Sequence, residues 1–279
     1  MPTFDSADGT RLAYRRTGSG DPLICLPGGP MMASAYLGDL GGLGGQRSLV
    51  LLDLRGTGRS AVPADPATYR CDRQVEDVES LRHHLGLDRI DLAAHSAGAA
   101  VALHYAARHP ERVGRLMLLN PSPRVVAVTV DDADRRAVAE QRSAEPWFPA
   151  AFAAFARIWS GQPADADWAA IQPFLWGRWD DASRERAERE ATERNAEAAA
   201  AYYADGGPDP GRLRSALAEL PVPVLLVAGE YDVALPPQRA VEYAALFGEA
   251  EAVVQPGGGH QPWVDDPRRF LASVAAFLR

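Results

Sequence analysis

Ser96 is the residue of this chain best suited by its surroundings to act as a nucleophile. It lies in "AAHSAGAA", where the strand-like run "IDLAA" gives way to apolar residues at helical spacing with no breaker before Pro110. A serine at such a corner sits in a strained turn, and its neighbours two positions away, Ala94 and Gly98, are small enough to avoid a clash. This spacing matches the nucleophile elbow G-x-S-x-G with alanine for the first glycine, and it predicts covalent catalysis by the Ser96 hydroxyl.

His260 is the candidate general base that a serine hydroxyl needs at neutral pH. It follows "QPGGG" and a strand-like run, and a flexible loop at a strand end lets a base reach the nucleophile of another strand. A structural loop histidine is the alternative. The remaining histidines lie on predicted helices or directly beside Ser96: His83, His84, His95, His104 and His109.

Asp232 is the candidate for the acid that orients this base. In "VPVLLVAGEYDVALP" it comes just after an apolar run and a glycine, and it preserves the chain order Ser, Asp, His. Glu230 is a competitor, whereas Asp265 and Asp266 follow the histidine and fit this order less well. The carboxylate would hold the imidazole tautomer and stabilise the imidazolium, and a turn or helix-cap aspartate is the alternative interpretation.

Two backbone N–H groups are candidates for an oxyanion hole. One belongs to Ala97, directly after the nucleophile, and the other to Gly29 in "LPGGPMM". Pro30 has no N–H to offer, and the glycines let the backbone approach a substrate closely. Without the other candidates, "PGGP" would indicate only a tight turn.

The elements around these residues alternate between strand and helix. We expect a hairpin centred on Asp8-Gly9, a helix over 72–86 with Asp72 as its N-cap, and a parallel sheet covered on both faces. The expected core strands are "PLICL", "RSLVLLDL", "IDLAA", "VGRLMLLN", "VPVLLVAG" and "EAVVQ".

A helical insertion interrupts this alternation. From 124 to 213 there is no convincing buried strand, and the region includes a long run of helix formers over 180–204. We therefore predict three segments: a first part of the core over 1–123, a helical cap over 124–213 and a second part of the core over 214–279.

Taken together, these motifs resemble the α/β-hydrolase superfamily and, more narrowly, the proline iminopeptidase-like group of serine peptidases. The resemblance covers nearly the whole chain and rests on "LPGGP", "DLRGTGRS", "AHSAG", "GEYD" and "GGGH" in this order. It implies an α/β-hydrolase fold, a mostly parallel sheet flanked by helices, with a cap inserted over the active site. Pro27, Met31 and Ala97 depart from the group's motifs, which leaves the substrate open.

"WGRWDD" within the cap resembles the group's Trp-x-x-Trp-Glu motif. The resemblance implies that Asp180, with Trp176 and Trp179, binds the free α-amino group of a substrate, because a carboxylate beside apolar rings favours a cation. Asp180 is one methylene shorter than the glutamate of the motif. A core tryptophan pair beside a solvated aspartate at a helix start is the alternative.

The expected function is cleavage of an amide or ester bond in a small molecule or short peptide through an acyl-enzyme. The resemblance favours an aminopeptidase; an esterase, a lactonase or a hydrolase that tailors a specialised metabolite is the alternative. A ligand-binding protein without catalysis is a third hypothesis, because a fold alone does not determine function.

The composition of the chain limits the classes of partner that we expect. A net charge of -8 without a basic run argues against nucleic-acid binding, and no apolar run is long enough to cross a membrane. The start lacks the plan of a signal peptide, so we expect a cytoplasmic protein. Two cysteines and no cluster of ligand-type residues indicate neither a metal nor another cofactor, and the oligomeric state stays open.

Overall fold

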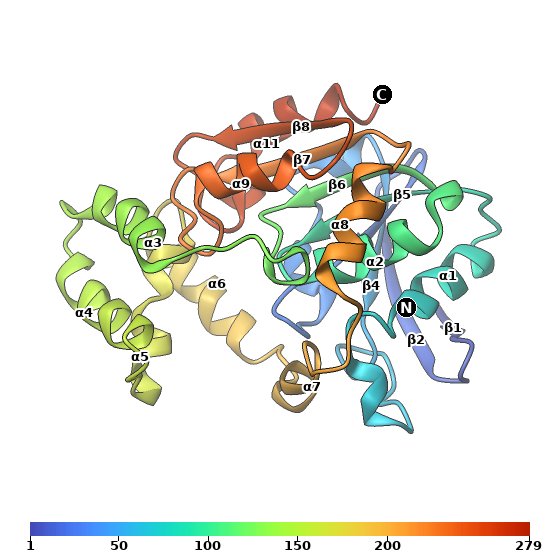
Figure 1. Ribbon diagram of the computed structural model, residues 1–279, viewed down its shortest axis with the longest axis horizontal. Coiled ribbons are helices and arrows are strands. Elements are labelled where there is room, and N and C mark those ends of the chain that lie inside the picture. Colours follow the sequence, from blue (N-terminus) through green and yellow to red (C-terminus); the bar gives the residue numbers. More distant parts are fainter.

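A sheet of eight strands forms the centre of the computed structural model, which describes residues 1–279. The strands lie in the order β1-β2-β4-β3-β5-β6-β7-β8 (Figure 1). The β1-β2 and β2-β4 pairs are antiparallel and all others are parallel. The strand bounds are β1 Thr3–Asp5, β2 Arg11–Thr17, β3 Pro22–Leu26, β4 Ser48–Asp53, β5 Ile90–His95, β6 Val113–Leu119, β7 Val224–Gly229 and β8 Ala250–Gln255.

Helices cover both faces of this sheet, because its central strands are apolar on both sides. Every residue of β4 and β7 is buried. The helix bounds are α1 Val75–His84, α2 Gly98–Arg108, α3 Asp132–Ala139, α4 Phe148–Trp159, α5 Asp165–Ala170, α6 Asp181–Ala191, α7 Ala196–Ala201, α8 Pro210–Ala218, α9 Pro237–Ala244, α10 Pro262–Asp265 and α11 Pro267–Ala275. This is the predicted architecture of a mostly parallel sheet flanked by helices, and the prediction is confirmed.

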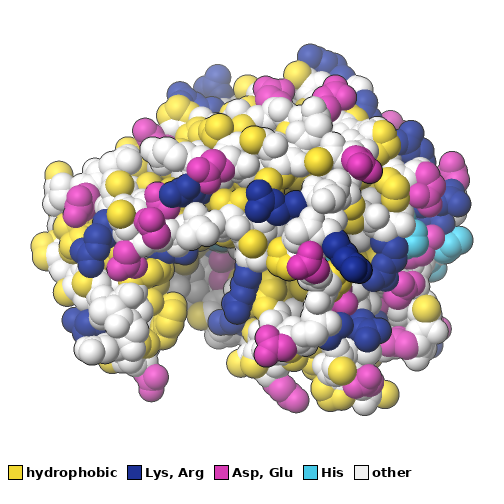
Figure 2. Space-filling model, viewed as in Figure 1, with side chains coloured by type: hydrophobic (Ala, Val, Ile, Leu, Met, Phe, Trp, Pro, Cys, Tyr) yellow, Lys and Arg dark blue, Asp and Glu magenta, His cyan; other side chains and the backbone are white.

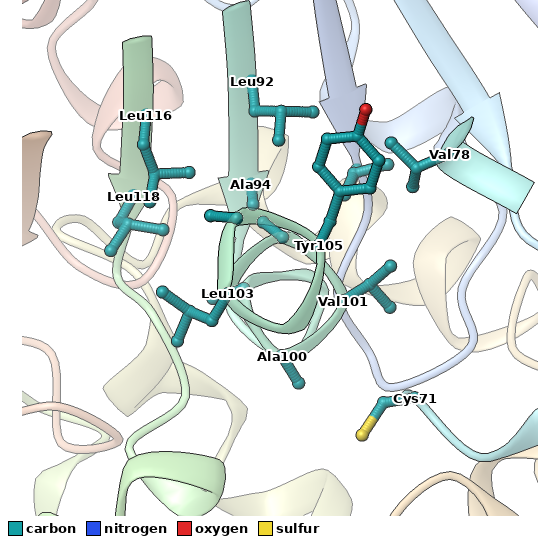
Figure 3. Packing of buried hydrophobic residues seen from close by; sticks show 14 of the residues in the cluster. Cys71, Val78, Leu92, Ala94, Ala100, Val101, Leu103, Tyr105, Leu116 and Leu118 are labelled. Atoms are coloured by element: carbon teal, nitrogen blue, oxygen red, sulfur yellow. The ribbon is translucent and has the colours of Figure 1, made fainter. Parts of the chain in front are cut away.

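Alternate residues of each strand point to opposite faces of the sheet and belong to two separate apolar layers. On one face, side chains such as Leu92 and Leu116 pack against α1, α2, α8 and α9. Figure 3 shows Leu92 and Ala94 of β5 next to Val101 and Leu103 of α2. On the other face, residues that alternate with these pack against the short helix η1 (Ser34–Leu37), α10 and α11. Packing on both faces holds the strands of the sheet in position, and it therefore also fixes where the loops at the strand ends begin.

The helices α3 to α7 lie between β6 and α8 in the chain, within the segment predicted to be a cap. In Figure 1, α3, α4 and α5 form a lobe beside the sheet. This lobe has a small apolar cluster of its own, in which Phe155 and Phe174 are fully buried. The predicted end of the cap at residue 213 falls inside α8.

The long run of helix formers over 180–204 forms two helices, α6 and α7, with a break between them. At the break the Ala33 N–H donates to Glu193 O at 3.1 Å, and the Asn195 N–H donates to Met31 O at 2.9 Å. The Asn195 side chain then caps α7 by accepting from the Ala198 N–H. Pairing with the glycine-rich loop therefore overrides the local helix propensity.

Asp72 does not cap α1 as predicted. The helix begins at Val75, and the Asp72 carboxylate instead accepts from Nε of Arg70 at 2.6 Å. An ion pair in a half-buried loop thus replaces the expected cap. No helix of the structure has the length and apolar character needed to cross a membrane.

Candidate active site

Ser96 lies at the sharp corner between β5 and α2. Its φ angle of 50° falls in the left-handed region, which costs strain for a residue with a Cβ atom. The corner is tied to the sheet, since the Ser96 N–H donates to Leu119 O at 3.0 Å and the Ser122 N–H donates to Ser96 O at 2.9 Å. Gly98 is required because a Cβ atom there would lie 2.4 Å from Pro27 O. This backbone presents Ser96 to a cavity.

Asp232 and His260 meet beyond the ends of the neighbouring strands β7 and β8. Nδ1 of His260 donates to Oδ2 of Asp232 at 2.8 Å. The fully buried Asp232 also accepts from Nδ2 of Asn120 at 2.6 Å and from the Ala234 N–H at 2.8 Å. Because a carboxylate only accepts, Nδ1 carries the proton, and Nε2 of the neutral ring is free to accept another.

The pKa of His260 is set by two opposing effects. Burial lowers it, but the charge of Asp232, the hydrogen bond to Asp232 and the charge of Glu190 raise it, and the net pKa lies above the ordinary value of 6.5. A base whose pKa lies near the working pH transfers protons efficiently in both directions.

Ser96 and His260 line the same cavity. The structure shows no hydrogen bond between Ser96 Oγ and His260 Nε2, whereas the contact of His260 with Asp232 is formed. Catalytic hydrogen bonds are often long in ligand-free enzymes and shorten when substrate binds. The three predicted residues therefore share one site, with one of their two contacts made.

The N–H groups of Gly29 and Ala97 are both free in this structure. Neither donates to another group of the protein. Gly29 has a φ of 115° and lines the cavity, and Ala97 lies directly before the first turn of α2. Free N–H groups beside a nucleophile are suited to stabilise a developing oxyanion.

A chain of hydrogen bonds, which the sequence did not reveal, links the glycine-rich loop to the His260 loop. The Gly28 N–H donates to Oη of Tyr36 at 2.7 Å, Tyr36 Oη lies 2.6 Å from Nδ1 of His95, and Nε2 of His95 lies 2.8 Å from His260 O. A carbonyl only accepts, so Nε2 of His95 donates and Nδ1 accepts from the Tyr36 hydroxyl. Burial and the charge of His260 lower the pKa of His95, which keeps its ring neutral. The hydrogen bonds therefore all run in one direction, with each donor pointing from the Gly28 N–H towards the carbonyl of His260.

The cavity has a volume of about 610 Å³ and lies between the sheet and the helices α5 and α6. In Figure 2 the surface is hollowed between the lobe of α3 to α5 and the part that carries α7. Apolar side chains make up much of the wall: Met32, Trp168, Ile171, Leu175, Trp176, Ala187, Ala191 and Ala234. No group of three or more His, Cys, Asp or Glu side chains could hold a metal ion. The space suits a small, largely apolar organic molecule.

Of the three residues predicted to bind substrate, only Trp176 lines this cavity. Its buried indole N–H has no hydrogen-bond partner in the protein. Asp180 lies outside, where it caps α6 by accepting from the Ser183 N–H at 3.1 Å and pairs with Nε of Arg178 at 2.8 Å. Trp179 also lies outside the cavity, with the guanidinium of Arg184 5.8 Å from its ring centre. The predicted amine-binding carboxylate is therefore not placed to reach a substrate of Ser96.

Glu190 is the carboxylate that does line the cavity. It pairs with Nε of Arg186 at 2.9 Å and accepts from Nε2 of Gln261 at 2.7 Å. Burial raises its pKa despite the charge of Arg186. Nothing in the sequence distinguished Glu190, because it belongs to a helix of interleaved glutamates and arginines that is typical of a solvated surface.

Comparison with known proteins agrees with this geometry. The profile of the family described as alpha/beta hydrolase fold matches residues 21–267. A proline iminopeptidase of Heyndrickxia coagulans is 24% identical over 305 aligned residues, which cover 99% of this chain and 97% of the relative.

Solved structures extend the likeness to other hydrolases. A thermophilic esterase from Thermogutta terrifontis superposes with a TM-score of 0.70 at 25% identity and covers 100% of this chain and 97% of its own. The enol-lactonase of Burkholderia xenovorans has a TM-score of 0.67 at 22% identity, with 99% of each chain covered, and at that identity it shows the fold alone. These findings confirm the predicted resemblance and leave the substrate class open.

Proposed function

Because the chain belongs to the alpha/beta hydrolase fold family, we propose that it is a serine hydrolase that cleaves an ester bond of a small substrate through an acyl-enzyme. The observation that carries this proposal is the 2.8 Å hydrogen bond from His260 to the buried Asp232, in the cavity that Ser96 lines. An oriented base beside a serine at a strained corner is the arrangement that activates a hydroxyl.

In the first half of the proposed reaction, Ser96 Oγ attacks the substrate carbonyl while Nε2 of His260 takes its proton. Asp232 stabilises the resulting imidazolium, and the N–H groups of Gly29 and Ala97 stabilise the oxyanion. The leaving alcohol then takes the proton from His260. In the second half His260 activates a water molecule, which hydrolyses the acyl-enzyme and releases the acid.

An ester is favoured over a peptide because the cavity presents no free carboxylate to a substrate amine. Asp180 is outside, and Glu190 is neutralised by Arg186. Aminopeptidase action is the second candidate, since the full-length similarity to a proline iminopeptidase favours it and Glu190 is close enough to influence His260.

A fluorophosphonate probe tests whether the serine is activated. We expect labelling of the wild type, and loss of labelling in Ser96→Ala and in His260→Ala. Wild-type protein that resists the probe, and hydrolyses no ester or arylamide, would favour the ligand-binding hypothesis.

A substrate panel separates the two enzyme hypotheses: short-chain p-nitrophenyl esters against prolyl and alanyl arylamides, for the wild type, Glu190→Gln and Asp180→Ala. Ester turnover without arylamide turnover supports the esterase. Arylamide turnover that Glu190→Gln removes and Asp180→Ala leaves intact would establish an aminopeptidase in which Glu190 binds the amine.

A further inference from the structure

Ser96 also lines a second cavity, which we describe as a second lobe of the site. This lobe has a volume of about 400 Å³ and shares Ser96, Ala234 and His260 with the first. Its remaining wall comes from the segment after β6 and from the start of α3. Because both lobes are lined by Ser96 and His260, a group of a substrate bonded to Ser96 has either lobe within reach.

The second lobe is cationic. Arg124 and Arg135 line it, and no aspartate or glutamate does. Neither arginine forms an ion pair in the structure; the guanidinium of Arg124 lies 4.8 Å from the ring centre of Tyr203, and that of Arg135 lies 5.4 Å from the ring centre of Trp159. The first lobe differs in holding a carboxylate: the half-buried Glu190, paired with Arg186, lines it together with Arg194, an exposed arginine that forms no ion pair. We call the second space the arginine lobe.

Arg135 is a half-buried cation that forms no ion pair. Its Nη1 donates to Val233 O at 2.7 Å and its Nη2 to Val130 O at 3.4 Å, while its buried Nε–H has no partner. Burial lowers the pKa of Arg135, which reflects the cost of removing this charge from water.

The carboxylates whose charges act on Arg135 make no ion pair with it. Asp134 pairs with Nε of Arg239 at 2.8 Å, Asp131 caps α3, Asp132 is an exposed residue of its first turn, and Asp232 is bound to His260. Backbone carbonyls, including Ala234 O at 3.4 Å from Nη1, are the only acceptors of Arg135, so an anion that enters the lobe would meet a cation that no carboxylate pairs with.

We propose that the arginine lobe binds a carboxylate carried by the substrate, so that the enzyme prefers esters with a negative charge in the half that occupies this lobe. The inference rests on the proposed serine hydrolase function and names its substrate class. A guanidinium recognises a carboxylate well, because its planar N–H groups pair with the two oxygens and lose little hydration.

Two pairs of esters test the proposal, one for each half of the substrate. In the first pair the acyl half varies, monoethyl adipate against its neutral amide, ethyl adipamate. In the second pair the leaving group varies, para-carboxyphenyl butyrate against para-carbamoylphenyl butyrate. We expect kcat/KM for the carboxylate to exceed that for its amide by about tenfold in one of the pairs, the effect of one charge-assisted hydrogen bond.

Arg135→Gln and Arg124→Gln should each lower this ratio severalfold. The matched control is Arg136→Gln, which changes the next residue of α3, does not line the lobe, and should keep the wild-type ratio. If Arg135→Gln does not fold, Arg124→Gln still tests the lobe, because Arg124 is exposed. An inhibition assay tests the same point without a variant. We expect adipate to inhibit the wild type in competition with a neutral ester, and adipamide not to inhibit it.

If kcat/KM for the carboxylate does not exceed that for its amide in either pair, and hydrolysis still depends on Ser96, the proposed role of the arginine lobe is wrong. The proposed serine hydrolase function would still stand. Absence of any hydrolysis that depends on Ser96, together with resistance to the fluorophosphonate probe, would instead overturn the proposed function and this inference with it.

Discussion

The sheet and the inserted helices contribute different parts of the site. Ser96, Asp232 and His260 each follow a strand, β5, β7 or β8, whose position is set by parallel pairing and by an apolar layer on each face. The helices α5 and α6 contribute side chains of the wall, such as Trp168 and Glu190. The lobe of α3 to α5 is built on a cluster of 8 buried residues, one of which is Val233 from the loop after β7, against 43 and 16 in the two layers of the sheet, so it is the region expected to open more easily.

Hydrogen bonds join the two regions near the base. The His260 N–H donates to Leu175 O at 2.8 Å, and the Gly177 N–H donates to Oδ1 of Asp265 at 2.9 Å. Under the proposed mechanism, the sheet supplies the reacting groups and the inserted helices supply contacts that select the substrate. Changes in the first region should therefore act on kcat, and changes in the second on KM or on the ratio between substrates.

The largest expected effect comes from Ser96→Ala. Without the nucleophile, kcat for any ester substrate should fall by about 10⁴-fold or more, because the remaining groups only orient the substrate and stabilise charge. Steady-state assays measure this, with Ser160→Ala, an exposed serine of the inserted helices, as the control that keeps wild-type rates. Substantial turnover by Ser96→Ala would show that the chemistry does not begin at the corner after β5.

Asp232→Asn should lower kcat by about 10³- to 10⁴-fold, since the amide favours the wrong imidazole tautomer. The pH profile adds a second readout. The base acts in its neutral form, so kcat/KM of the wild type falls as the pH drops through the pKa of His260, which lies above 6.5.

Removal of the Asp232 charge lowers the pKa of His260, and the acid limb of the profile should move to lower pH. An acid limb at the same pH in both proteins would mean that another group controls the titration.

Tyr36→Phe tests the hydrogen-bond chain between the glycine-rich loop and the His260 loop. The change leaves the Gly28 N–H and Nδ1 of His95 without a partner, and we expect kcat to fall about tenfold with little change in KM. Tyr105→Phe is the control, because it removes a hydroxyl of similar burial that donates to Glu79 away from the cavity. Equal losses of kcat in both variants would contradict a specific role for Tyr36, because the loss of any buried hydroxyl would then have the same effect.

The smallest effect should come from Asp180→Ala. Loss of the cap of α6 should lower Tm by about 2 °C, with kcat/KM for esters within twofold of the wild type. Asp181→Ala, which removes a neighbouring charge without the cap, is the control, and thermal shift with steady-state kinetics measures both. A large loss of kcat/KM in Asp180→Ala alone would instead support the substrate-binding role that the sequence predicts for Asp180.

Much of the sheet and of the candidate triad could be predicted from local patterns. The apolar runs that form β3 to β8, the small residues around Ser96 and the glycines before His260 carry their information within a few positions each. The break between α6 and α7 could not be predicted in this way, because it depends on pairing with the loop at Met31 and Ala33, about 160 residues earlier in the chain.

The order of the elements and the residue types suited to chemistry could be predicted from the sequence, because strand periodicity and a strained serine corner are local properties. Which side chains share the cavity depends instead on the fold. It placed Asp180 at a helix cap outside, brought Glu190 inside, and set Arg124 and Arg135 beside Ser96 without a counter-charge. The physical reason is that burial and ion pairing depend on neighbours distant in sequence, and these neighbours decide which charges remain free for a substrate.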